Sequence, residues 1–180
     1  MIFKSFEINK IDNKINQLIL FYGKNDGLKK EALNILIKGK NNIQNYEEKE
    51  ILENESNFIE NILSKSLFEK EKFIVIKRAT DKILKVIETL HLKNLEDTTI
   101  ILNSDNLEKK SKLRSLFEKD KKLVCVPFYP DNNQTLSKLT YNFLNDKKIS
   151  INFKILSVDL LIIINLFCSK RDLDKMLSIK

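Results

Sequence analysis

The chain has few of the residues on which metal centres and nucleophilic catalysis depend. Its 180 residues include one His, two Cys, three Gly, two Pro and no Trp. A single histidine, His91, makes a poor metal site and is the sole candidate base. Cys125 and Cys168 lie inside apolar runs without C-x-x-C spacing, which favours reduced core thiols over a disulfide or zinc site. We therefore expect no metal, no cofactor and no catalytic triad.

Long apolar runs are also absent. The most apolar late segment, 160–168, is far shorter than the roughly 20 residues that a membrane span needs. No apolar segment opens the chain, so a secretory signal is not expected. We expect a cytoplasmic protein with 42% apolar residues, enough for a real core.

Arginine is scarce although the chain is basic. The net charge is +7, from 32 basic and 25 acidic residues, and this favours an anionic partner such as nucleic acid. Only three residues are arginine, the side chain best suited to phosphate and base recognition: Arg78, Arg114 and Arg171. Lysines cluster at 109–112 and 119–122 without interleaved aromatics, which favours a solvated face. A basic nucleic-acid-binding module remains one alternative.

An apolar run followed by two glycines has the layout of a nucleotide-binding loop. Residues 18–22 predict a buried strand, Gly23 and Gly27 a tight loop, and the pattern that follows a helix. A working phosphate loop reads G-x-x-x-x-G-K-S/T, whereas these glycines are one residue too close and Leu28 follows the second. We interpret the loop as degenerate. The rival is a divergent P-loop ATPase or kinase that uses Gly23, Gly27 and Lys29.

Strands alternate with helices along most of the chain. Further buried strands are predicted at 73–76, 99–102 and 123–126, with a short edge strand within 40–50. Helical stripes separate them, and Asp105 or Asn106 is the expected cap of the last helix, with Gly39 ending the first. This order predicts a three-layer α/β domain with a parallel sheet.

A helical second domain is expected after the sheet. Pro127 and Pro130, the two prolines, bracket Phe128 and mark a boundary there. We predict domains at 1–127 and 128–180, the second helical and incomplete, because its last amphipathic pattern stops without a cap.

The third predicted strand lacks the acidic residues of a catalytic ATPase. It runs into Lys77 and Arg78, with no carboxylate before Asp81, and the neighbouring strand ends in Asn103, which we interpret as a turn residue. The adjacent pair Glu47 and Glu48 is expected on a solvated face.

Two large apolar residues, Leu67 and Phe68, stand alone in a charged segment between a helix and a strand. Such a pair either packs under the sheet edge or serves as an exposed anchor for a partner protein. The pattern alone favours packing.

Taken in order, these motifs resemble the delta subunit of the bacterial DNA polymerase III clamp loader. The similarity rests on the strand and loop at 20–28, on Ser66-Leu67-Phe68 before the strand at 73–76, and on 128–131. The resemblance implies an AAA+/P-loop type α/β domain with a degenerate nucleotide loop, followed by a helical lid domain. It also implies that the collar domain is missing.

The resemblance further implies a function in DNA replication. In that family the Leu-Phe pair inserts into the sliding clamp and helps to open the ring, so Leu67 and Phe68 become the expected clamp-binding residues. The other clamp-loader subunits, and primed DNA within the assembled loader, are expected partners of this accessory subunit of a DNA-directed DNA polymerase. No intrinsic catalysis is expected.

Overall fold

The computed structural model describes residues 1–13, 15–40, 42–64, 71–93, 95, 97–132 and 135–136. Within them the chain forms five strands: β1 (Leu18–Tyr22), β2 (Ile43–Glu47), β3 (Lys72–Lys77), β4 (Thr98–Asn103) and β5 (Val124–Pro127). The α-helices are α1 (Asp26–Leu36), α2 (Glu48–Glu53), α3 (Glu55–Leu63), α4 (Leu84–Leu92) and α5 (Lys112–Lys119). Two 3₁₀ helices, η1 (Ser5–Lys10) and η2 (Asp81–Ile83), complete the order.

The strands form one all-parallel sheet in the order β2-β3-β4-β1-β5. The first strand in sequence therefore lies near the centre, paired with β4 on one side and β5 on the other. β2 lies at the edge, as predicted for the short strand within 40–50. The sequence-predicted α/β class with a parallel sheet is confirmed.

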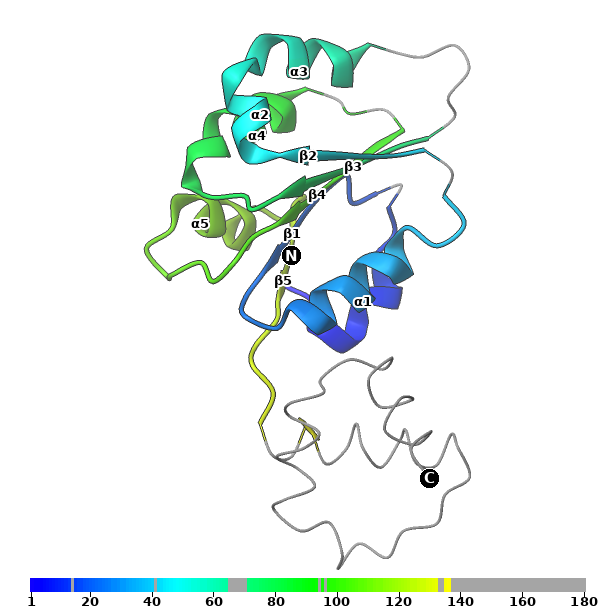
Figure 1. Ribbon diagram of the computed structural model, residues 1–180, viewed down its shortest axis with the longest axis vertical. Helices are drawn as coiled ribbons and strands as arrows, with labels where there is room; N and C mark the ends of the chain where they lie inside the picture. The colour runs from blue at the N-terminus through cyan, green and yellow to red at the C-terminus, as the bar shows by residue number, and fades with distance from the viewer. Residues whose placement is uncertain are drawn as a thin grey trace, which may run out of the picture. The chain divides into compact units, whose positions relative to one another are not determined.

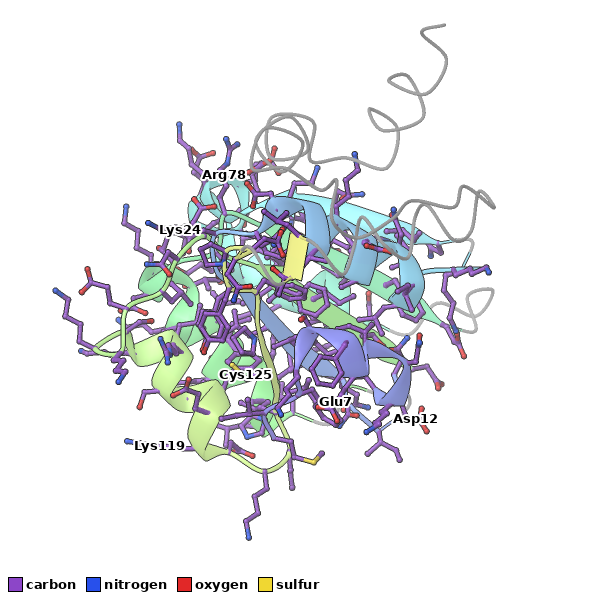
Figure 2. All side chains as sticks on the ribbon, turned by 90° about the horizontal axis from the view of Figure 1, so that it is seen from below. Glu7, Asp12, Lys24, Arg78, Lys119 and Cys125 are labelled. Atoms are coloured by element: carbon purple, nitrogen blue, oxygen red, sulfur yellow. The ribbon has the colours of Figure 1, made fainter. Side chains whose placement is uncertain are left out.

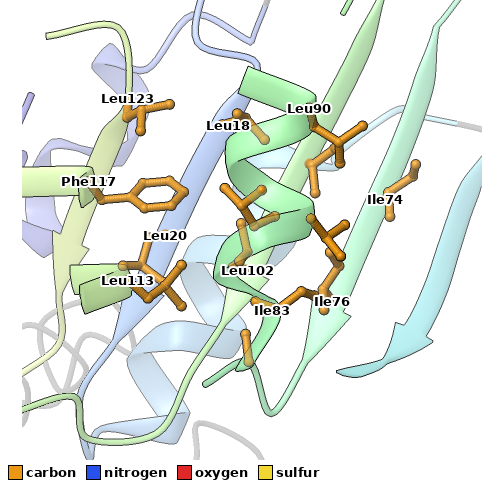
Figure 3. Close-up of a cluster of buried hydrophobic side chains, with 14 of the residues drawn as sticks. Leu18, Leu20, Ile74, Ile76, Ile83, Leu90, Leu102, Leu113, Phe117 and Leu123 are labelled. Carbon is orange, nitrogen blue, oxygen red and sulfur yellow. The ribbon is translucent and has the colours of Figure 1, made fainter. Parts of the chain in front are cut away.

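Helices cover both faces of the sheet, so the architecture has three layers (Figure 1). Alternate residues of β1 divide between two cores because neighbouring side chains of a strand point to opposite faces. Leu18 and Leu20 join α2, α3, α4 and α5 in the larger core, part of which Figure 3 shows. Ile19 and Phe21 join η1 and α1 in the smaller one.

The start of the chain covers the outer edge of β5. Ile2 forms a parallel bridge with Cys125, whose backbone N–H donates to the Met1 carbonyl at 2.8 Å. The Phe3 N–H donates in turn to the Cys125 carbonyl at 3.0 Å. These bonds satisfy backbone groups that a parallel edge strand would otherwise leave open.

Two predicted helix ends were wrong, and one helix was not predicted. α5 begins at Lys112 and not after Asp105 or Asn106, and its N-cap is Ser111, whose Oγ accepts from the Arg114 N–H at 3.2 Å. Helix α1 ends at Leu36, and Gly39 makes the positive-φ turn (+76°) beyond its cap. The six-residue α2 was not predicted because Ile51 alone supplies its apolar face.

The chain divides into two compact units, Met1–Tyr129 and Pro130–Lys180. Phe128, the predicted boundary residue, is buried in the smaller core of the first unit with its ring 5.0 Å from that of Phe21. The predicted helical lid and nearly all of the second unit lie outside the described residues. Among the described helices, none combines the length and apolar character needed to cross a membrane.

Candidate functional site

The loop between β1 and α1 lies at the carboxyl edge of the sheet, beside the end of β4. Ligand sites of parallel α/β folds form at this edge, where strand ends meet helix N-termini. The degenerate nucleotide loop predicted from the sequence lies here, with Gly23 directly after β1 and Gly27 in the first turn of α1.

Gly23 is required by both backbone conformation and packing. Its φ is +124°, in the region that side-chain-bearing residues rarely adopt. A Cβ added there would lie 2.1 Å from the carbonyl oxygen of Phe128. The Gly23 N–H donates to the Asp105 carbonyl at 3.0 Å. Gly23 therefore lets two later segments of the chain approach the loop closely.

Backbone carbonyls of the segment after β5 accept hydrogen bonds from polar groups of the loop. The Asn25 backbone N–H donates to the Phe128 carbonyl at 3.4 Å, and the Asn25 side-chain amide donates to the Tyr129 carbonyl at 3.3 Å. The Asn25 Oδ1 caps α1 by accepting from the Leu28 N–H at 3.1 Å. In a working phosphate loop such N–H groups face the nucleotide, whereas here Gly23 and Asn25 donate to carbonyls of the protein itself.

Lys29 is buried in the first turns of α1, with only 2% of its surface exposed. Its ammonium donates to the Ser104 carbonyl at 2.8 Å and forms an ion pair with Asp26 at 2.9 Å. These bonds tie α1 to the end of β4. The sequence singled out Lys29 as a candidate phosphate ligand; the structure gives its charge protein partners, as a buried ammonium requires.

The junction of β2 and α2 carries two carboxylates, those of Glu47 and Glu48, that sequence reasoning had assigned to a solvated face. That prediction was wrong for Glu48, which is buried and accepts from the Thr80 N–H at 2.6 Å and from the Thr80 hydroxyl at 3.0 Å. Glu47 pairs with the Arg78 guanidinium at 2.8 Å. No local signal could have found this contact, because the N-cap of α2 is Glu47 and the carboxylate of Glu48 bonds a residue about 30 positions later in the chain.

Asn103 is the last residue of β4 and pairs with Phe21 of β1 and Lys77 of β3, so its interpretation as a turn residue was wrong. Its carbonyl accepts from the Ala79 N–H at 3.1 Å and so ties the turn after β3 to β4.

Leu67 and Phe68, the predicted clamp-binding pair, lie outside the described residues. Helix α3 ends before them at Leu63, and β3 begins after them at Lys72. Their assignment stays a prediction.

His91 and Cys125 are each held by structural contacts. His91 lies in the last turn of α4, with its Nε2 2.8 Å from Asp120 Oδ2. A hydrogen bond from the Lys122 N–H and the His91 contact outweigh burial and lower the pKa of Asp120. Burial raises the pKa of the Cys125 thiol to about 12, which disfavours the reactive thiolate. Across the described parts of the chain no three His, Cys, Asp or Glu residues gather where they could hold a metal ion.

The structure brings together some lysines of the two basic clusters at 109–112 and 119–122. Lys109, Lys110, Lys112 and Lys119 line one open groove beside α4 and α5. Lys121 and Lys122 line a different hollow. The Arg114 guanidinium bonds Glu118 at 2.8 Å and lies over the Tyr22 ring at 4.8 Å. Sequence reasoning missed the groove, although the seven-residue spacing of Lys112 and Lys119 places both on one helix face.

Comparison with known proteins reveals similarity in fold. No family model matches the chain, and no curated protein sequence matches it. The Bacillus subtilis DNA clamp loader delta protein (YqeN) superposes with a TM-score of 0.58 at 13% identity over 79% of this chain. Because the match covers 46% of the delta protein, the chain spans about half of its length.

Two other solved structures match with lower TM-scores. Domain III of the Thermotoga maritima replication initiation protein DnaA matches with a TM-score of 0.45 and 15% identity, over 84% of this chain and 70% of that one. Saccharomyces cerevisiae RIF2 matches with a TM-score of 0.49 and 17% identity, over 91% of this chain and 66% of that one. The chain has an AAA+-like α/β fold, and the similarity to the delta protein supports this fold alone.

Proposed function

We propose that this chain is a noncatalytic clamp-loader subunit that binds and opens the replicative sliding clamp. The observation that carries the proposal is the fold match to the clamp loader delta protein, at a TM-score of 0.58 over 79% of the chain. The sequence motifs that resemble the delta family occur in the same order along the chain. The other loader subunits, and primed DNA within the assembled loader, are its proposed partners.

The geometry of the loop after β1 supports a subunit without catalysis. Two of its N–H groups donate to protein carbonyls, and the nearby Lys29 ammonium bonds Ser104 and Asp26. A P-loop ATPase or kinase would need these groups for phosphates and an acidic residue to hold Mg²⁺. These contacts therefore support a noncatalytic α/β domain that holds the clamp-binding residues in place, and they argue against an enzyme.

Leu67 and Phe68 are the proposed clamp anchor. Aromatic and aliphatic side chains that fill a partner's pocket dominate the binding energy of many interfaces. The segment that holds them follows helix α3 and precedes strand β3, so both of its neighbours in the chain belong to the α/β domain.

Calorimetry tests this proposal directly. The chain is titrated with the sliding clamp of the same organism in the absence of nucleotide, and is compared with the double variant Leu67→Ala, Phe68→Ala. We expect the double variant to lose at least about 2 kcal/mol of binding free energy, roughly a thirtyfold weaker Kd, because two anchors are truncated.

A matched control removes the same residue types elsewhere. Phe6 and Leu92 are 76% and 86% exposed, so Phe6→Ala with Leu92→Ala should leave clamp binding unchanged. Wild-type affinity in the Leu67, Phe68 variant would refute the site. Failure of the folded wild-type chain to bind the clamp would refute the function.

A further inference from the structure

An open groove of about 610 Å³ lies on the surface formed by α4 and α5. Helix α4 contributes Leu84 and Glu88, and α5 contributes Lys112, Leu116 and Lys119. Lys109 and Lys110, from the turn before α5, complete its basic side. The groove lies on the face of the sheet opposite to α1 (Figure 1) and does not include the loop after β1.

The groove is electropositive. No ion pair engages the ammonium groups of Lys109, Lys112 or Lys119 within the part of the chain that the structure describes, and Figure 2 shows the Lys119 side chain extending outward. Lys110 pairs with Glu108 at 2.9 Å, but both side chains are largely exposed. One of the two acidic lining residues, Asp120, is already bonded to His91 and to the Lys122 N–H. The four lysines of the lining therefore outnumber its two carboxylates, those of Glu88 and Asp120.

Between the lysines the groove has an apolar floor. Leu84 and Leu116 are half-buried and pack against the larger core, with part of each side chain still accessible. Lysine stems add further apolar surface below their charged ends. The groove thus combines apolar contact area with a rim of positive charge.

This combination distinguishes a peptide from a nucleic acid. A phosphate backbone would match the lysines but would not use the leucines. Among the residues that line the groove, none is aromatic or Arg, so the groove offers no stacking surface for bases. A helix with carboxylates flanking an apolar stripe matches both the lysines and the leucines, in the helix-in-groove manner.

We propose that the α4–α5 groove binds an acidic amphipathic segment of a partner protein. The apolar side chains of the bound segment lie on Leu84 and Leu116, and the carboxylates of the segment pair with Lys112 and Lys119. The proposal does not rest on clamp binding, because its residues are separate from Leu67 and Phe68.

Fluorescence anisotropy with a synthetic probe tests the groove in the full chain. The probe is a labelled glutamate–leucine peptide of about 15 residues, with its leucines on one helical face, used at about 50 mM salt. We expect the double variant Lys112→Gln, Lys119→Gln to weaken its binding about tenfold, the effect of losing two ion pairs. The matched variant Lys30→Gln, Lys38→Gln removes the same charge from and beside α1, on the opposite layer, and should bind like wild type.

Two further probes separate the possible occupants. A peptide with glutamines in place of the leucines keeps the charge, and we expect it to bind at least tenfold more weakly because the apolar floor is unused. A single-stranded oligonucleotide of equal charge should bind more weakly still. Equal binding of the glutamine peptide, or tighter oligonucleotide binding through the same lysines, would overturn the proposal. So would a folded chain, checked by circular dichroism, that does not bind the leucine peptide.

Discussion

At the scale of single residues, Gly23 and Gly27 differ although the sequence assigned both to one tight loop. Replacing Gly23 by Ala places a methyl group against the Phe128 carbonyl and forces an L-residue to φ +124°. We expect Gly23→Ala to lower the free energy of unfolding by about 3 kcal/mol, from overpacking and backbone strain combined. Urea denaturation measures this change. Gly27 is in helix α1, so Gly27→Ala should be neutral or stabilising by up to about 1 kcal/mol, and equal losses in both variants would contradict the assignment.

At the scale of secondary structure, α5 depends on a carboxylate from another element. Asp81, in η2, accepts hydrogen bonds from the Ser111 hydroxyl at 2.5 Å and from the Lys112 and Leu113 N–H groups at 3.1 and 3.0 Å. Burial alone would raise the pKa of Asp81, but these donors outweigh it and hold the pKa below its ordinary 3.8. We expect Asp81→Ala to cost about 1.5 kcal/mol at pH 7.

The pH dependence of this loss has a definite sign. A depressed carboxyl pKa contributes stability above the unfolded pKa, and the contribution disappears as the pH falls through the folded pKa. The difference between wild type and Asp81→Ala should therefore be largest at neutral pH and shrink below about pH 4. Thermal unfolding across the acid range measures it. A difference independent of pH would refute the role of the charge. Asp105→Asn is the control, since Asp105 is exposed and outside the cap, and should change stability by less than about 0.5 kcal/mol.

The same elements show what local sequence can and cannot predict. Strands β1, β3, β4 and β5 follow from apolar runs because a strand covered on both faces needs apolar side chains throughout. The predicted start of α5 was wrong because the hydrogen-bond donors of its first turn donate to Asp81, about 30 residues earlier in the chain. The loop after β1 was predicted as a turn, but nothing local indicates that Phe128 lies against it. Contacts between distant residues decide both cases.

At the scale of the whole molecule, the contacts around the loop predict a protein whose stability does not depend on nucleotide. A ligand bound at 100 times its Kd would add about 2.7 kcal/mol, which raises the Tm of a chain of this size by roughly 5–10 °C. We expect Mg-ATP to shift the Tm by less than about 1 °C relative to Mg²⁺ alone, because Lys29 and the N–H groups of Gly23 and Asn25 already have protein partners. A shift of several degrees would favour the ATPase alternative.

The central position of β1 in the sheet constrains how the chain acquires its structure during synthesis. β1 pairs with β4 on one side and β5 on the other, and β4, the earlier of the two in sequence, begins at Thr98. At the usual ribosomal rate of about 5–20 residues per second, the apolar β1 leaves the ribosome several seconds before its first neighbour has been made. The pairing of β1 with its neighbouring strands therefore forms late. Until then β1 is an unpaired apolar segment that chaperones can bind.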